Sequence, residues 1–193
     1  VGPFEHHSNL LPWRETGSRI IRVVENEHGS LDLNDLELRL QEIQVTKPPL
    51  IIGTFAAASN VTGVLTDVDA VTALLHQYGA LAVWDYATAG PYVTMDMNPP
   101  AVNSSMTDVS LSKDAIIFSP HKFLGGVNTP GVLVIKKKHC TNNVPSQPGG
   151  GTVFFVTKDS HRFLSHRSDR EEGGTPDIVG TIRAGLACQL KTS

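Results

Sequence analysis

The sequence contains few cysteines and no long apolar run. Only two of its 193 residues are cysteine, Cys140 and Cys188, which lie far apart and form no CxxC pair. Such usage is typical of a reducing compartment, so we expect a cytoplasmic or organellar protein rather than a disulfide-bonded secreted one. No apolar run approaches the roughly 20 residues of a membrane helix, and no signal-peptide pattern begins the chain. We therefore expect no membrane partner.

A strong charge of either sign is also missing. The 16 Lys and Arg residues are nearly balanced by 19 Asp and Glu residues, and the formal net charge is −3 at pH 7. Without a basic stripe, nucleic acid is not expected as a partner. The triplets Asn60-Val61-Thr62 and Asn103-Ser104-Ser105 match the N-glycosylation sequon, but in a reducing compartment we expect both matches to be accidental.

Apolar runs and helical patterns alternate along the chain, of which 40% is hydrophobic. Strands are expected at 20–24, 50–57, 81–84, 115–118 and 131–136, helices at 34–44, 66–78 and 178–190, a glycine-rich loop at 145–151, and a charged loop or a helix with long ends at 159–174. The first two helices begin with capping boxes at Asn34 and Thr66, and Gly79 fits the position just after the second helix. This alternation predicts an α/β fold with three layers, in which helices cover both faces of a mainly parallel sheet.

Polar residues follow three of the predicted strands. Asn60, Asp85 and Lys122 each lie just beyond the carboxyl end of an apolar strand. In open α/β sheets, ligands bind in the crevice outside those ends. We therefore expect these three side chains to converge on one pocket.

Lys122 is the residue to which we assign the chemistry. An amine held in an apolar pocket after a buried strand is less readily charged than one in water, so it becomes a nucleophile able to form a Schiff base with an aldehyde cofactor. Asp85 can pair with a protonated pyridine nitrogen, which strengthens that ring as an electron sink. The alternative for Asp85 is a carboxylate that caps a turn or a helix.

Two further groups of polar residues have less specific patterns. His6 and His7 would point to opposite faces of a strand, which is a poor arrangement for zinc, so no metal is expected. One of the pair can stack on a ring or shuttle a proton; the alternative is a pair of loop residues. Ser119, His121 and the turn at 173–176 can offer hydroxyl, imidazole and backbone N–H donors to a phosphate.

Four motifs together resemble those of the class V, fold-type I pyridoxal-phosphate (PLP) enzymes, especially the cysteine desulfurase and selenocysteine lyase branch. They are EHHSNLLPW at 5–13, SNVTG at 59–63, SPHK at 119–122 and REEGGTP at 170–176, in the family's order. The resemblance runs from about Phe4 to Leu190. It implies the fold of a PLP-dependent transferase large domain, pyridoxal 5′-phosphate as the cofactor and a small amino acid as the substrate.

The resemblance also implies a role for each site residue. Lys122 would carry the cofactor as a Schiff base, and Asp85 would pair with its pyridine nitrogen. His6 would stack on the cofactor ring, with a role in proton transfer. Asn60 would donate a hydrogen bond to the phenolic oxygen.

The phosphate end of the implied site involves a second subunit. Ser119 and His121 would bind the phosphate, and Thr175 would reach the phosphate of the neighbouring subunit, which implies a homodimer with shared active sites. The family has Gln or His three positions after its aspartate, whereas this chain has Thr88, which is too short for the same contact. We keep Thr88 among the expected cofactor-binding residues.

Residues 1–193 are expected to form part of the PLP-binding large domain, with the N-terminal phosphate loop segment and the C-terminal small domain outside the chain. The mobile cysteine nucleophile of desulfurases belongs to that small domain, and neither Cys140 nor Cys188 lies where it should be. The expected function is that of a PLP-dependent enzyme acting on an amino acid, most like a cysteine desulfurase. The alternatives are another class V aminotransferase or β-lyase, and a catalytically inactive PLP-fold module for dimerisation or binding. A Rossmann oxidoreductase is excluded because no GxGxxG follows the first strand.

Overall fold

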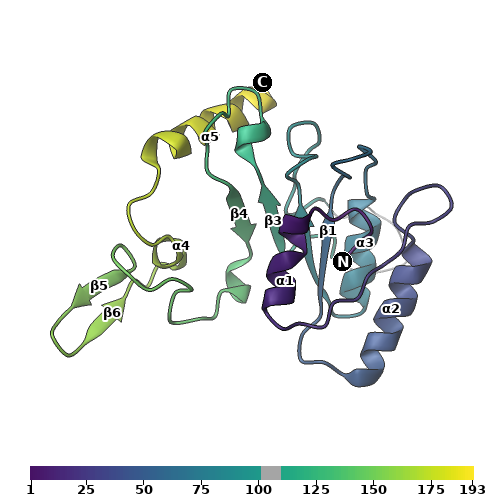
Figure 1. Ribbon diagram of the computed structural model, residues 1–193, viewed down its shortest axis with the longest axis horizontal. Helices are drawn as coiled ribbons and strands as arrows, with labels where there is room; N and C mark the ends of the chain where they lie inside the picture. Colours follow the sequence, from purple (N-terminus) through teal and green to yellow (C-terminus); the bar gives the residue numbers. More distant parts are fainter. Residues whose placement is uncertain (101–109) are drawn as a thin grey trace.

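The computed structural model describes residues 1–100 and 110–193 of the chain (Figure 1). The sequon at Asn103 lies outside the described residues. The α-helices are α1 (Leu11–Glu15), α2 (Leu33–Thr46), α3 (Val68–Gln77), α4 (Arg167–Glu171) and α5 (Ile178–Thr192). The strands are β1 (Ile52–Ala56), β2 (Leu81–Asp85), β3 (Ala115–Phe118), β4 (Val132–Ile135), β5 (Val153–Val156) and β6 (His161–Phe163). Three short 3₁₀ helices are η1 (His7–Asn9), η2 (Pro120–Lys122) and η3 (Lys137–His139).

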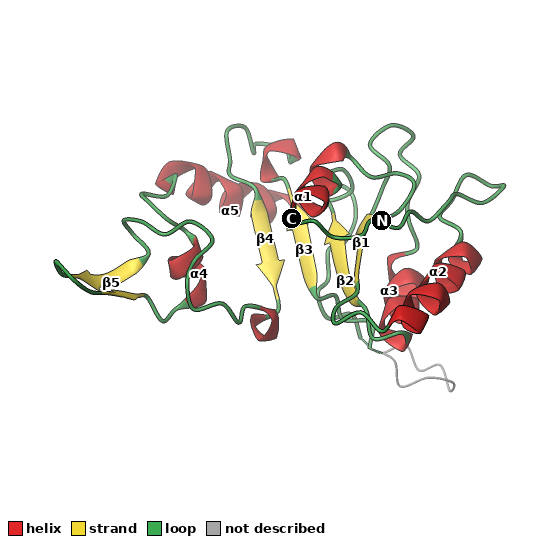
Figure 2. Ribbon diagram, turned by 60° about the horizontal axis from the view of Figure 1, so that its bottom comes forward, coloured by secondary structure: helices red, strands yellow, loops and turns green. Residues whose placement is uncertain are grey.

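The central sheet has four strands in the order β1-β2-β3-β4. The first three are parallel, and β4 runs antiparallel to β3. The strands β5 and β6 form a separate antiparallel hairpin, which lies apart from the sheet in Figure 2. The sheet is thus mainly parallel, as the alternation of strands and helices predicted.

Helical segments pack against both faces of the sheet. On one face, the indole N–H of Trp84 in β2 donates to the hydroxyl of Thr72 in α3 at 3.0 Å, and both side chains are fully buried. On the other face, Asn9 of η1 bonds to Thr54 of β1. The predicted α/β fold with helices on both faces is confirmed.

The core lies between α3 and the sheet. Phe55 and Trp84 pack with ring centroids 5.9 Å apart, and both are at most 1% exposed. Gly53, on the same face of β1, allows this approach, because a Cβ there would overlap the side chain of Leu75 from α3. Burial of such aromatic and aliphatic surface is the main favourable term in folding.

Several predicted elements are confirmed and others are wrong. The strands at 50–57, 81–84, 115–118 and 131–136 all form, as do the three helices, and Gly79 has a left-handed φ of 68° after α3. Residues 20–24 form no strand; their neighbour Glu25 makes only an isolated bridge with Leu31. The segment at 159–174 was expected without a strand, but it contains β6 as well as α4.

The helix caps differ from those predicted. The carboxylate of Asp32, not Asn34, accepts the first free backbone N–H groups of α2. Likewise Asp67, not Thr66, caps α3 by accepting from the N–H of Ala70. The hydroxyl of Thr66 instead donates to the carbonyl of Ala56, at the end of β1. Aspartate is as good an N-cap as Asn or Thr, so neighbouring candidates are not separated by residue type.

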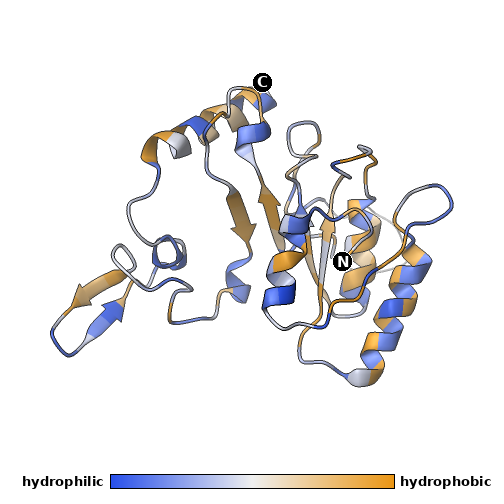
Figure 3. Cartoon of the chain, in the orientation of Figure 1, coloured by the Kyte–Doolittle hydropathy of each residue, from blue (hydrophilic) through white to orange (hydrophobic). Residues whose placement is uncertain are grey.

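Much apolar surface remains exposed beyond the core. Figure 3 shows hydrophobic residues along β4, β5 and the first part of α5. On α5 the exposed apolar side chains are Ile178, Val179, Ile182, Leu186 and Leu190, each at least half exposed. Of the helices in the described parts of the chain, none combines the length and the apolar character needed to span a membrane.

Candidate functional site

The parallel strands end together at one edge of the sheet. Ala56 of β1 pairs with Asp85 of β2, and Asp85 pairs with Ile117 of β3. The turn that carries Asn60 follows Ala56 after a few residues, and the turn that carries Lys122 follows Ile117 in the same way. The register therefore places the loops with the three predicted polar residues along the same carboxyl edge.

Asp85 occupies the centre of this edge, in the last position of β2. Its backbone carbonyl accepts from the N–H of Ala57 at 2.9 Å, and the N–H of Tyr86 donates to Ile117 at 2.7 Å. Its half-buried carboxylate accepts from the N–H of Ala87 at 2.8 Å. The second carboxylate oxygen has no hydrogen-bond partner among the described residues. The turn-capping alternative is thus realised with one oxygen, and the other is available to a ligand.

Lys122 ends the 3₁₀ turn η2, directly after β3. The turn buries Pro120 and Phe123, whose ring stacks on that of Phe118 with centroids 5.9 Å apart, and it leaves His121 and Lys122 exposed. The expectation that Lys122 lies in an apolar pocket is therefore wrong for this chain by itself. The 3₁₀ geometry explains the difference, because it turns the two basic side chains away from the packed side.

Asn60 lies at the tip of a tight turn after β1. The hydroxyl of Ser59, which is 4% exposed, accepts from the backbone N–H groups of Val61 and Thr62 at 3.3 and 3.1 Å. The N–H of Gly63 donates to the Ser59 carbonyl at 3.0 Å. These bonds fix the turn around Ser59 and leave the Asn60 side chain exposed.

His6 and His7 lie at the start of η1. The sequence led us to expect a strand with the two rings on opposite faces. The structure instead has a 3₁₀ helix here, and the two ring centroids are 3.9 Å apart. Nδ1 of His6 accepts from the N–H of Ser8 at 3.2 Å, so a neutral ring carries its proton on Nε2. The preceding residue, Glu5, accepts from the N–H of Ala56 at 2.9 Å, which brings the His6 turn to the carboxyl end of β1.

The remaining predicted residues lie in two places. Ser119 and Thr88 are half-buried in the loops that follow β3 and β2, and His121 is exposed on η2, so all three are on the carboxyl edge. Thr175 is exposed in the loop before α5, where the N–H of Gly174 donates to the carbonyl of Gly150.

Thr175 is not brought together with the other site residues within one chain. Near the beginning of α5, Arg183 donates to the carbonyl of Val127. At the other end of α5, Lys191 lies 5.7 Å from the ring centroid of Phe123, next to Lys122. The length of α5 therefore separates Thr175 from the turn that carries Lys122.

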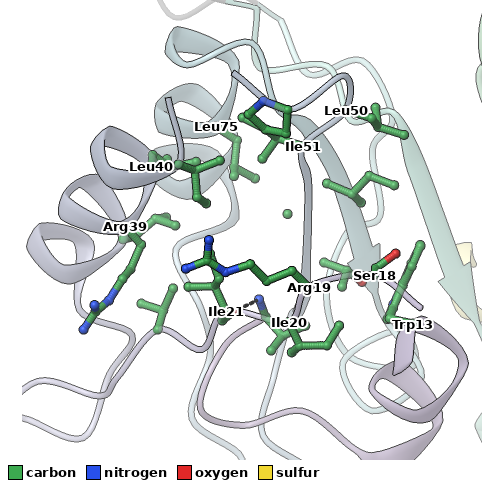
Figure 4. A pocket seen from close by; sticks show the side chains of 18 of the residues that line it. Trp13, Ser18, Arg19, Ile20, Ile21, Arg39, Leu40, Leu50, Ile51 and Leu75 are labelled. Atoms are coloured by element: carbon green, nitrogen blue, oxygen red, sulfur yellow. Dashed lines mark hydrogen bonds between the residues drawn. The ribbon is translucent and has the colours of Figure 1, made fainter. Parts of the chain in front are cut away.

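The chain also has a pocket away from this edge. A cavity of about 410 Å³ lies between α2, the outer edge of β1 and residues 18–21, and Figure 4 shows the side chain of Arg19 extending across it. Leu40, Ile51 and Leu75 contribute to its mainly apolar lining. None of the predicted site residues lines it, so it is not the predicted site.

Sequence reasoning missed two polar residues near the site. Glu5 and Asn9 lie in the motif at 5–13 but received no role. The side chain of Asn9 donates to that of Glu5 at 2.6 Å, and both side chains accept hydrogen bonds from residues of β1. The spacing of four residues between a carboxylate and an amide was the only signal in the sequence.

The fold and this polar carboxyl edge define an α/β domain of the open, mainly parallel type. Comparison with known families matches residues 1–192 to the class V aminotransferases. The chain belongs to this family, as the resemblance of its four motifs implied.

Known relatives and solved structures agree with this assignment. The chain is 31% identical to a probable cysteine desulfurase of Pyrococcus abyssi over 98% of its length and 30% identical to one of Halalkalibacterium halodurans over 97%. It superposes over its whole length on the crystal structure of the cysteine desulfurase CsdA from Escherichia coli, with a TM-score of 0.76 and 25% identity, covering 45% of that chain. For the apo cysteine desulfurase of Thermococcus onnurineus the TM-score is 0.73, with 29% identity, and the match covers 99% of this chain and 44% of that one. The chain spans 43% and 42% of the two relatives' lengths, so it corresponds to less than half of each.

Proposed function

We propose that the protein carrying this chain is a PLP-dependent enzyme that acts on a small amino acid, most like a cysteine desulfurase. The observation that carries the proposal is the carboxyl edge of the sheet, where an amine, a carboxylate and an amide occupy three neighbouring strand ends in a member of the class V family. The relatives named above are themselves called cysteine desulfurases.

The residues at this edge fit pyridoxal phosphate chemically. Asp85 keeps one carboxylate oxygen without a partner among the described residues, and a carboxylate is the group that pairs with a protonated pyridine nitrogen. The side-chain amine of Lys122 has no hydrogen bond or ion pair with any described residue, and the residue is exposed, so the amine is accessible to an aldehyde. The side chain of Asn60 is exposed on the adjacent turn and offers an N–H donor.

Each residue has a proposed part in holding the cofactor. Lys122 would hold the aldehyde carbon through its amine, and Asp85 the pyridine nitrogen. Asn60 would donate to the phenolic oxygen, and His6 would lie against the ring. Ser119 and His121 would bind the phosphate, together with Thr175 from a second copy of the chain, and Thr88 would be a further cofactor-binding residue.

The chemistry that pyridoxal phosphate supplies when bound is an electron sink for charge that develops at the α-carbon of an amino acid. The protein then has to move protons at defined atoms. Lys122, once free, would act as the base and acid at the α-carbon. Asp85 would keep the ring nitrogen protonated, and the Nε2–H of His6 would be available for transfer to the substrate.

The quaternary state, location and extent of the protein are part of the same proposal. A homodimer with shared sites is supported by the apolar side chains that α5 leaves exposed directly after Thr175. A cytoplasmic or organellar location is supported by Cys140 and Cys188, which are both free thiols. We propose that residues 1–193 form part of a PLP-binding large domain.

The test is an assay of the full-length protein with pyridoxal phosphate and L-cysteine. We expect a cofactor absorbance band near the visible edge and the formation of alanine as the sulfur atom of the substrate passes to an acceptor thiol, which becomes a persulfide. Lys122→Ala should abolish both, while Lys47→Ala, in the exposed turn after α2, should change neither. Amino transfer or β-elimination without alanine would favour the other class V reactions. A protein that never takes up pyridoxal phosphate would contradict the proposal.

A further inference from the structure

A buried polar network connects the His6 turn to β1. Glu5 accepts from the backbone N–H of Ala56 at 2.9 Å and from the side-chain N–H of Asn9 at 2.6 Å. The carbonyl oxygen of the Asn9 side chain accepts from the hydroxyl of Thr54 at 2.7 Å and from the indole N–H of Trp13 at 3.4 Å. Asn9 and Thr54 are 4% and 2% exposed.

The direction of every bond in this network is fixed by chemistry. The indole N–H of Trp13 can only donate, so the side-chain oxygen of Asn9 must face it. The NH₂ group of Asn9 then faces Glu5, and Glu5 must accept with that oxygen. Its other oxygen accepts from the backbone N–H of Ala56. No part of the network can be reversed without leaving two donors or two acceptors in contact.

The network acts at the point where β1 meets the candidate site. Ala56 is the last residue of β1 and pairs with Asp85. Because β1 is an edge strand, the N–H of Ala56 points away from β2, beside the candidate site. Glu5 covers this N–H and directly precedes His6. The turn is closed from the other side, because the N–H of Asn9 donates to the carbonyl of His6 at 2.8 Å. Both ends of the His6 turn are therefore tied to the same strand.

We propose that Glu5 and Asn9 are positioning residues, which hold His6 at the carboxyl end of β1 so that its ring faces the cofactor. This inference rests on the proposed function, because it concerns the cofactor of that site. Burial of Glu5 raises the pKa of its carboxyl group, and the bonds from Ala56, Asn9 and Gly2 oppose that rise. They favour the ionised, accepting form that the network requires.

A polarity swap tests the contact between the two residues. Glu5→Gln places an amide N–H₂ against either the N–H₂ of Asn9 or the backbone N–H of Ala56, and Asn9→Asp places a carboxylate against that of Glu5. The double variant Glu5→Gln/Asn9→Asp restores one donor and one acceptor, and the new carboxylate at position 9 can still accept from Trp13 and Thr54. Two matched single changes and a rescuing double change thus report on one contact.

The readouts are the dissociation constant for pyridoxal phosphate and the induced circular dichroism of the bound cofactor, measured in the full-length protein. We expect each single variant to bind about 10-fold more weakly, as for the loss of a buried hydrogen bond to a charged group. Each should also reduce the induced signal towards that of His6→Ala, and the double variant should recover most of both losses. Thr72→Val is the matched control: it removes a buried hydrogen bond on the opposite face of the sheet and should leave the cofactor signal unchanged.

The outcomes separate this inference from the proposed function. If the unaltered protein binds no pyridoxal phosphate, the proposed function fails. If it binds, and the single variants keep its affinity and induced signal while they melt at a lower temperature, Glu5 and Asn9 are structural only and the inference is overturned. Should the single variants not fold, Thr54→Val decides the question, because it removes one donor to Asn9 without changing the shape of the side chain. A loss of induced signal in Thr54→Val, smaller than that in His6→Ala, supports the inference, and an unchanged signal contradicts it.

Discussion

At the scale of single residues, the Asp85 carboxylate has one oxygen engaged and one without a partner. One oxygen closes the turn by accepting from the N–H of Ala87, and the other has no hydrogen-bond partner among the described residues. Capping a turn therefore leaves Asp85 able to take the ligand-binding role that we propose for it. The two interpretations that its sequence context allows do not exclude each other.

The first residue-scale prediction concerns the charge of Asp85. Asp85→Asn keeps an acceptor for the Ala87 N–H, so the melting temperature should stay nearly unchanged. Pyridoxal phosphate should bind at least about 10-fold more weakly, because a hydrogen bond to a charged group contributes about 1.5–3 kcal/mol. Equilibrium titration of the full-length protein measures the affinity. Unchanged binding would argue that another group meets the pyridine nitrogen.

A second residue-scale prediction concerns Gly53. In Gly53→Ala, the added Cβ overlaps the side chain of Leu75, so α3 or β1 has to shift. Forcing an extra carbon into a packed core costs about 1–3 kcal/mol in the free energy of unfolding. Denaturant unfolding measures this cost. Gly149→Ala, in a loop where a Cβ meets nothing, is the control and should be near neutral.

At the scale of elements, the amino edge of the sheet is held by a charge cluster distinct from the site. Asp114, which directly precedes β3 and is 2% exposed, accepts from the N–H of Ala82 and from the rings of His76 and His139. It ties together the end of α3, the start of β2 and the helix η3 that follows β4. Burial by itself raises the pKa of the Asp114 carboxyl, but the hydrogen bonds from Ala82, His76 and His139 and the charge of Lys136 outweigh it and hold that pKa well below its usual range.

The lowered pKa of Asp114 predicts an acid-sensitive fold. Because the folded-state pKa lies below the unfolded value of 3.8, the stabilisation is complete above that pH and is lost as the pH falls towards the folded-state pKa. Asp114→Ala should lower the free energy of unfolding at neutral pH by about 3 kcal/mol, since it leaves the buried N–H of Ala82 and the partly buried rings of His76 and His139 without their acceptor. It should also flatten the dependence of stability on pH below 4. An equally steep acid transition in the variant would rule out Asp114 as its source.

The strands show which sequence patterns were sufficient to predict secondary structure. Apolar strands with few polar residues, such as β2 and β3, were found with boundaries close to those in the structure. The hairpin of β5 and β6 was missed, although Val153–Val156 is a run of four apolar residues that could have indicated a strand. Its partner His161-Arg162-Phe163 has no apolar run, so the pairing itself has no pattern in the sequence.

The candidate site was also predictable only where local sequence patterns determine it. Asn60, Asp85 and Lys122 were placed at strand ends from local patterns, and parallel pairing sets those three strand ends along one edge of the sheet. The burial of Lys122 was predicted wrongly, since η2 could not be inferred from the apolar run before it. The Glu5 and Asn9 contacts join segments 51 and 45 residues apart, which no local pattern records.

At the scale of the whole molecule, the exposed apolar face of α5 predicts an interface. Ile178, Ile182 and Leu186 recur at helical spacing and are each about 60% exposed. In the full-length protein, Ile182→Lys with Leu186→Lys should convert the proposed dimer to monomer, as measured by sedimentation. Val45→Lys, on α2 at 82% exposure, is the control and should leave the dimer intact. A dimer that persists in the double variant would exclude this face from the interface.

The central claim is that one amine, at the end of β3, holds the aldehyde of pyridoxal phosphate against the carboxyl edge of the sheet. Its most direct test is borohydride reduction of the full-length protein with bound cofactor, followed by proteolysis and mass spectrometry of the peptide that contains Lys122. The account predicts that the pyridoxyl mass is attached at Lys122 alone and disappears in Lys122→Ala. A label on another lysine, or one that survives this substitution, would contradict it.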